Sequence, residues 1–201
     1  MELPAEHTFS YWNSSLNATG YFEQPHIRVT KVPHNLQLQP THDLAAPLTW
    51  SRADWGALKG HSAISYYFAK ELSELLNGSD ATPIGIIESS WGGTIIESWI
   101  ETEAQKTCSY RLCGPDAPID KTTGLPKVCN SSVMDSHQQP GSLYNGMVLP
   151  MANLTIKGAI WYQGENNGAN SNGSFVSHTG YHCLLPVRIA NICRLFSGFF
   201  Y

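Results

Sequence analysis

The clearest recurrence of apolar positions along the chain predicts a helix over Ser62–Asn77. Apolar residues return there with the spacing of one face of a 3.6-residue helix. These residues are Ile64, Tyr67, Phe68, Leu72, Leu75 and Leu76. Asn77-Gly78 is a typical helix end, and Ser62 stands at the position of an N-cap.

Three shorter apolar stretches predict β-strands. Ile27–Val32 alternates apolar and polar side chains, as a half-buried strand does, and a proline follows it. Ile84–Ile87 is apolar throughout apart from one glycine, which is typical of a strand buried on both faces. Ile156–Tyr162 predicts a second buried strand, and Gly164 ends it.

Two further helices and a long loop are expected. Thr94 and Glu97 fit a T-x-x-E capping box, which predicts a helix that continues to about Lys106. Residues 107–141 contain four prolines but little periodicity, which indicates a long loop. A shorter helix is predicted over Ser142–Met151. The apolar side chains that it presents are Leu143, Met147 and Val148.

The order of these elements predicts an α/β fold. A helix, a strand, a turn, a helix, a loop and a strand follow one another, which implies right-handed crossovers and a parallel sheet. We find no internal repeat, so we expect residues 1–201 to form a single domain. Ligands of such sheets collect beyond the carboxyl ends of the strands. Two glycine-rich motifs of the chain come directly after predicted strands.

Composition is consistent with this fold and excludes several partners. The chain has 201 residues, of which 42% are hydrophobic and 14% charged, so it suits one α/β domain or most of one. A net charge of −4 and a pI of about 6.0 provide no basic surface for nucleic acid or anionic lipid. No apolar run approaches the ~20 residues that a membrane span needs. No signal-peptide pattern follows Met1, which indicates a true N-terminus further upstream.

Glycosylation sequons indicate a secreted or lysosomal protein. Six of the twelve asparagines begin an Asn-x-Ser/Thr sequon, and such acceptors matter only in the secretory pathway. They are Asn13, Asn17, Asn77, Asn130, Asn153 and Asn172. Chance enrichment in a chain rich in serine and asparagine is the alternative.

Five cysteines agree with an oxidising compartment, and their odd number leaves one unpaired. Cys108, Cys113 and Cys129 lie in a stretch rich in proline and glycine, where a disulfide would restrain the loop. The other two cysteines are Cys183 and Cys193. A zinc site is the alternative, but no CxxC pair or nearby histidine pair supports it, so no metal is expected.

The first glycine-rich motif is Ser89–Thr94, with the sequence SSWGGT. Its two glycines allow the backbone to approach a ligand closely, and the helix start predicted after it directs N–H groups toward that ligand. An oxyanion hole needs such donors. A plain tight turn is the alternative, whereas a phosphate loop lacks its GxxxxGK[ST] pattern.

The second motif, Gln163–Asn167, places several polar side chains at one predicted strand end. Carboxamides there can donate to an oxyanion, and the carboxylate can orient them. The alternative is a polar loop that satisfies its own backbone. Gly60-His61-Ser62 begins like a nucleophile elbow but lacks the final glycine and the preceding strand. No Ser-His-Asp triad can be assigned.

Both motifs lie in segments that resemble the sialate O-acetylesterase family. Pro83–Ile100 resembles the family's strand, SSWGGT turn and helix, and Leu143–Asn167 its short helix and WYQGE-x-N strand. Weaker similarity covers Ile27–Lys106. It continues into the tail, residues 174–201, as the pattern Y-x-C-x-x-P-x-x-I. The Asp-Trp-Arg of the family is replaced there by Asn191-Ile192-Cys193.

The resemblance implies a fold, a reaction and a set of site residues. The fold is the three-layer α/β/α arrangement of SGNH hydrolases, here incomplete, with a parallel sheet. The reaction is removal of O-acetyl groups from sialic acids by a serine-esterase mechanism that uses no cofactor. Gly92 or Gly93, through a backbone N–H, and Gln163, through its amide, would form the oxyanion hole. The residues implied in the substrate pocket are Trp91, Glu165 as orienter, and Asn167.

The resemblance also implies that part of the site is missing from these residues. The family's nucleophile lies in a GQSNM block, whose end Met1-Glu2 resembles, and its Asp/His base pair lies beyond Tyr201. We therefore expect a truncated or fragmentary enzyme that is inactive by itself. The rival interpretation is a non-catalytic carbohydrate-binding glycoprotein that retains the pocket, and a third is a structural glycoprotein. An in-frame GQSN upstream of Met1 would favour the enzyme.

Overall fold

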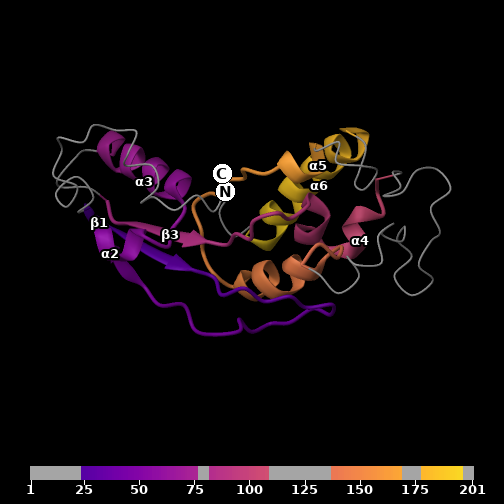
Figure 1. Cartoon of the computed structure of the whole chain (residues 1–201), viewed down its shortest axis with the longest axis horizontal. Helices are drawn as coiled ribbons and strands as arrows, with labels where there is room; N and C mark the ends of the chain where they lie inside the picture. Colours follow the sequence, from indigo (N-terminus) through magenta and orange to yellow (C-terminus); the bar gives the residue numbers. More distant parts are fainter. Residues whose placement is uncertain (1–23, 77–81, 109–136, 169–177, 197–201) are drawn as a thin grey trace. The chain divides into compact units, whose positions relative to one another are not determined.

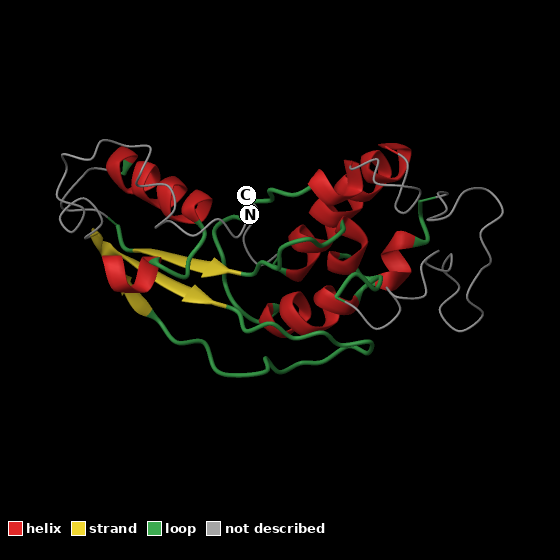
Figure 2. Cartoon of the chain, viewed as in Figure 1, coloured by secondary structure: helices red, strands yellow, loops and turns green. Residues whose placement is uncertain are grey.

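The computed structural model describes residues 24–76, 82–108, 137–168 and 178–196 (Figures 1 and 2). The chain divides into two compact units. The first unit is Met1–Pro33 with Ala46–Gly92, and the second is His34–Ala45 with Gly93–Tyr201. A single domain over the whole chain stays a prediction.

The first unit contains a mixed three-stranded sheet. Its strands are β1, Gln24–Lys31, β2, Ser51–Ala53, and β3, Ile84–Glu88, in the order β2-β1-β3. β1 runs parallel to β3 and antiparallel to β2. The predicted strands over Ile27–Val32 and Ile84–Ile87 are confirmed. The parallel pairing expected between the two predicted strands is confirmed, and the sheet is mixed because β2 is antiparallel. The expectation of a β3 buried on both faces is wrong, because β3 is only half-buried.

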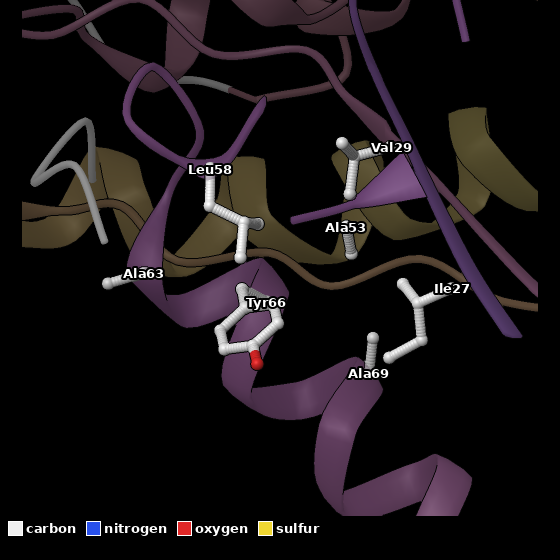
Figure 3. Close-up of a cluster of buried hydrophobic side chains, with 7 residues drawn as sticks. All are labelled: Ile27, Val29, Ala53, Leu58, Ala63, Tyr66 and Ala69. Atoms are coloured by element: carbon white, nitrogen blue, oxygen red, sulfur yellow. The ribbon is translucent and has the colours of Figure 1, made fainter. Parts of the chain in front are cut away.

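Helix α3, Ala63–Leu75, packs against this sheet together with the short helix α2, Trp55–Leu58. Figure 3 shows the resulting core, with the Tyr66 and Ala69 side chains of α3 beside those of the strands. The buried cluster consists of Ile27, Val29, Ala53, Leu58, Ala63, Tyr66 and Ala69. Two alanines on α3 allow the helix to approach the strands closely, and Tyr66 fills the remaining space.

The helix predicted over Ser62–Asn77 is confirmed, although its predicted end at Asn77-Gly78 lies outside the described residues, and its buried side differs from the apolar stripe. Its buried residues are Ala63, Tyr66, Ala69 and Ser73. Phe68 is 51% exposed and Leu75 79% exposed, because the small residues rather than the stripe face the sheet. Ser62 is the N-cap residue, as expected, although its side chain makes no capping hydrogen bond.

The second unit consists of short helices, one longer helix and connecting segments. The short helices are η3, Ile96–Trp99, α4, Thr102–Gln105, the π-helix η5, Tyr144–Val148, η6, Leu149–Met151, and α5, Glu165–Gly168. The longer helix is α6, His178–Leu195, which lies within the weakly matching tail. Ile96, Ile100, Cys108 and Leu184 form the buried core of this unit. The short helix predicted over Ser142–Met151 is confirmed as η5 and η6, with its apolar side chains buried.

Two predictions fail in the second unit. The capping box is absent, because Ile95 rather than Thr94 is the N-cap residue of η3 and no side chain caps it. The Thr94 hydroxyl accepts a hydrogen bond from the Trp99 indole. The single helix predicted here is divided into η3 and α4. Ile156–Tyr162 forms no strand. Ile160 and Tyr162 are about half exposed, which does not fit a strand buried on both faces.

A disulfide joins Cys108 to Cys183, which are 75 residues apart. Cys113 and Cys129 lie outside the described residues, and Cys193 is a free thiol. Of the sequons, Asn153 is described and exposed, whereas the other five lie outside the described residues. Most of the loop predicted over 107–141 also lies outside them. No helix in the described part of the chain is long and apolar enough to cross a membrane.

Candidate functional site

Gly93 begins the longer of the two segments that make up the second unit, and two side chains bind its backbone. It has a φ of 72°, a left-handed conformation that favours glycine. Its carbonyl accepts hydrogen bonds from the Gln138 amide at 2.9 Å and from the Asn166 amide at 2.6 Å. The Gly93 N–H donates to no other described residue. The turn is thus fixed through its carbonyl, and its N–H is not used within the described part of the chain.

Gln163 joins this turn to the second motif. Its Nε2 donates to the Thr94 carbonyl at 2.9 Å and to Asn167 Oδ1 at 2.8 Å. Both amide hydrogens are therefore engaged. The Gln163 Oε1 is buried and has no partner among the described residues. This side chain connects residues 69 positions apart in the chain.

Asn167 is buried and continues the connection. Its Oδ1 also accepts the Ile96 N–H at 2.9 Å, and its Nδ2 donates to Glu97 Oε2 at 3.0 Å. One carboxamide thus binds the Gln163 side chain, the backbone of η3 and a carboxyl group. Since every one of these bonds is buried or part-buried, they fix η3 and the Gln163–Asn167 motif relative to each other.

Glu97 is a buried carboxyl group that sequence analysis assigned to a capping box. It has no solvent exposure, and its Oε1 lacks a partner among the described residues. Burial raises the pKa of Glu97 to about 7, although the hydrogen bond from Asn167 acts in the opposite direction. Its apolar neighbours in the sequence, Ile95, Ile96 and Trp99, were the signal that it would be buried.

Aromatic side chains support the segment that carries Gln163. The Trp161 indole donates to the Tyr181 hydroxyl at 3.2 Å, and that hydroxyl donates to the Gln163 carbonyl at 2.7 Å. Trp161 also meets Trp99 edge-on, with 6.2 Å between ring centroids. The Tyr181 ring lies against Gly164, whose φ of 143° is in the region that favours glycine. A segment without regular secondary structure is therefore held in place here by side-chain contacts.

A separate polar cluster lies in the first unit, around Glu88 at the end of β3. The carboxylate accepts the Ser62 N–H at 2.8 Å and the Ser90 hydroxyl at 2.7 Å. Lys31 Nζ lies 3.1 Å and His61 Nδ1 3.2 Å from it. Burial alone would raise the pKa of Glu88, but the contacts with His61, Ser62, Ser90 and Lys31 outweigh it and lower the pKa to about 2.

This cluster is not a serine-hydrolase triad. In a triad the imidazole stands between the serine hydroxyl and the carboxylate. Here the Glu88 carboxylate stands between the Ser90 hydroxyl and His61. The arrangement holds the hydroxyl as a donor to a carboxylate, which stabilises the turn after β3 rather than activating a nucleophile.

Comparison with known proteins places these motifs in a family. No family model matches the chain. The chain is 35% identical over 169 residues to the sialate O-acetylesterases of Pongo abelii and Homo sapiens, an alignment that covers 81% of the chain. The enzyme of Mus musculus is 34% identical over 166 residues. The chain is homologous to the sialate O-acetylesterases.

The homology concerns part of these proteins. The chain spans 28% of the length of the sialate O-acetylesterases to which it aligns. Among solved structures, it is similar to a carbohydrate acetylesterase from Xanthomonas citri, with a TM-score of 0.69 and 25% identity. That similarity covers 98% of the chain and 36% of the other protein. An α/β fold with a mixed sheet agrees with this neighbour.

The structure brings together three of the residues that the sialate O-acetylesterase motifs assign to the site, namely Gly93, Gln163 and Asn167. Glu165 begins α5, is exposed, and hydrogen-bonds to no other described residue, so its orienting role stays a prediction. Trp91 and Gly92 belong to the first unit, and their roles stay predictions. Within the described residues, no group of three or more His, Cys, Asp or Glu side chains could hold a metal ion.

Proposed function

We propose that this chain contributes the oxyanion and acyl-binding part of a carboxylic ester hydrolase that removes O-acetyl groups from sialic acids. The observation that carries the proposal is the hydrogen-bonded network of Gly93, Thr94, Gln163 and Asn167, which joins the two family motifs across about 70 residues of chain. The homologous sialate O-acetylesterases supply the substrate class.

In this site the Gly93 N–H is the oxyanion donor. Its turn is fixed by two amides that bind its carbonyl, so the donor is already oriented before charge develops on the substrate oxygen. Gln163 acts first as a positioning residue, because both of its amide hydrogens bind protein oxygens. For Gln163 to be a second oxyanion donor, as the resemblance implies, its amide must break one of these two hydrogen bonds and donate to the substrate oxygen instead.

The remaining parts of the proposal rest on the resemblance. The nucleophilic serine and the Asp/His base belong to motifs that these 201 residues do not contain, and the reaction would pass through an acetyl-serine without a metal. The complete fold would be the three-layer α/β/α arrangement of SGNH hydrolases. A secreted or lysosomal location agrees with the exposed Asn153 sequon and the Cys108–Cys183 disulfide.

Saturation-transfer NMR tests the proposed pocket with the 201-residue chain and an O-acetylated sialic acid. We expect transfer to the O-acetyl methyl group, and no comparable signal with the de-O-acetylated sugar. Gln163→Ala should abolish saturation of the O-acetyl methyl group, since it removes the hydrogen bonds to Thr94 and Asn167. The matched control is Gln37→Ala, because that exposed side chain bonds only to Asn35.

Two results would contradict the proposed pocket. One is equal saturation of both sugars, and the other is saturation of the O-acetyl methyl group that persists in Gln163→Ala. The same proteins are incubated with nitrophenyl acetate, where we expect hydrolysis no faster than in buffer. Hydrolysis by the chain that disappears in Gln163→Ala would show that it carries its own nucleophile. A non-catalytic carbohydrate-binding protein would also bind the acetylated sugar without hydrolysing it. An esterase assay of the longer polypeptide distinguishes that protein from the proposed enzyme.

A further inference from the structure

Arg188 is a buried cation that the proposed reaction does not use. It lies on α6 and is only 5% exposed. Its Nε and Nη1 have no hydrogen-bond partner among the described residues. Burial lowers the pKa of Arg188 to about 10, so the guanidinium still carries its charge at neutral pH.

The groups around Arg188 provide no counter-charge. The guanidinium carbon lies 4.9 Å from the centroid of the Trp161 ring, in a cation–π contact. Tyr144 is its other polar neighbour, and burial raises the pKa of that phenol, which therefore stays neutral. The nearby Glu101 carboxylate is already paired with Arg194. No ion pair to Arg188 exists within the described part of the chain.

A buried guanidinium without an anion is unfavourable, because it has lost its hydration and gained no equivalent bonds. A cation–π contact with one tryptophan replaces only part of that hydration. The guanidinium also has donor groups to spare, and its planar fork matches a carboxylate. The arrangement is that of an anion-binding group whose partner comes from outside the described residues.

Arg188 is joined to the proposed acyl site by short covalent and hydrogen-bonded links. Trp161, on which it stacks, precedes Gln163 by two residues in a segment without regular secondary structure. The Trp161 indole also binds the Tyr181 hydroxyl, which in turn binds the Gln163 carbonyl. Arg188 is therefore linked to Gln163 through the side chains of Trp161 and Tyr181.

We propose that Arg188 binds the carboxylate of the sugar acid, so that this site selects O-acetylated sialic acids over neutral O-acetylated sugars. This assignment rests on the proposed function and adds the group that recognises the charge of the substrate. Gly93 and Gln163 would hold the acetyl ester, and Arg188 the acid at another point of the same molecule. Arg188 is thus a specificity-determining residue and takes no part in breaking the ester bond.

The test compares two ligands of the same shape. One is the methyl glycoside of an O-acetylated sialic acid, and the other is its carboxamide, which is uncharged. Isothermal titration with the unmodified chain should give a dissociation constant about tenfold lower for the acid, as expected for a hydrogen bond to a charged group. Arg188→Met should remove this preference, so that the acid and the carboxamide bind with similar dissociation constants.

Arg194→Gln is the matched control, because Arg194 lies on the same helix and is an exposed partner of Glu101. It should retain the preference for the acid. Equal binding of acid and carboxamide by the unmodified chain would overturn the assignment alone, even if Arg188→Met does not fold. A preference that persists in folded Arg188→Met would also overturn it. Binding of neither ligand would overturn both the proposed function and this assignment.

Discussion

At the scale of single residues, two buried glutamates are shifted in opposite directions by their surroundings. Glu88 has hydrogen bonds from Ser62 and Ser90, a contact with His61 and a cationic neighbour in Lys31, which outweigh burial and stabilise its charged form. Glu97 has one carboxamide donor and an oxygen without a described partner, so burial dominates and stabilises its neutral form. Their consequences for stability therefore appear in separate ranges of pH.

Glu97 should make the chain less stable as the pH rises from about 4.5 to about 7. In the unfolded chain this carboxyl releases its proton near pH 4.5, the ordinary value for a glutamate, whereas in the folded chain it keeps the proton until about pH 7. The difference corresponds to about 3 kcal/mol of stability lost across that range. Urea unfolding at a series of pH values from 4.5 upward to beyond 7 measures it. Glu97→Gln should remove most of the decline.

Glu103→Gln is the control for this measurement, since Glu103 is exposed and pairs only with Lys106 at the surface. It should leave the decline as it is. The contribution of Glu88 does not interfere, because its lowered pKa confines its effect to the range between about 2 and 4.5. A decline of the same size in Glu97→Gln would show that Glu97 is not the group responsible.

Sequence alone singled out the candidate residues of the proposed site but not the hydrogen bonds that connect them. The motif residues Gly93, Gln163 and Asn167 stood out because glycines and carboxamides were crowded after apolar runs. That Asn167 binds Glu97 could not be predicted, since it depends on packing between segments 70 residues apart. Arg188 was invisible for the same reason: nothing in its neighbourhood in the sequence indicates that an arginine would be buried.

At the scale of elements, periodicity predicted where α3 begins and ends but not which side it buries. The apolar stripe is the more hydrophobic face, yet Ala63, Tyr66 and Ala69 contact the sheet. Small side chains permit a close approach of helix and strands, and a hydrophobicity pattern gives them little weight. The failed strand over Ile156–Tyr162 has a related cause, because an apolar run predicts burial without specifying a partner.

Two substitutions on α3 distinguish these faces. Tyr66→Ala should lower the free energy of unfolding of the 201-residue chain by about 3–5 kcal/mol, because Tyr66 is fully buried in the core of the first unit. Leu75→Ala should change it by no more than about 0.5 kcal/mol, since Leu75 is 79% exposed. Urea unfolding followed by circular dichroism measures both. A larger loss for Leu75→Ala than for Tyr66→Ala would show that the apolar stripe is the packed face.

At the scale of the whole molecule, each of the two units has its own core and its own polar network. The proposed acyl site lies in the second unit, which has no described strand and is held instead by short helices, side-chain hydrogen bonds and a disulfide. Sequence analysis predicted one sheet with both motifs on its edge. The division into two units could not be predicted from the sequence. The strand expected before Gln163 is instead a segment without regular secondary structure, which the side chains of Trp161 and Tyr181 hold by hydrogen bonds.

The Cys108–Cys183 disulfide should be a major contributor to the stability of the second unit. It closes a segment of 75 residues that includes both Gln163 and Asn167, so its removal increases the conformational entropy of the unfolded chain. Replacing both cysteines by serine should cost about 4 kcal/mol in urea unfolding. Cys193→Ser is the control, because that thiol is free, and it should have little effect. If the double variant unfolds at the same urea concentration as the unmodified chain, the hydrogen bonds around Asn167 hold the unit without the disulfide.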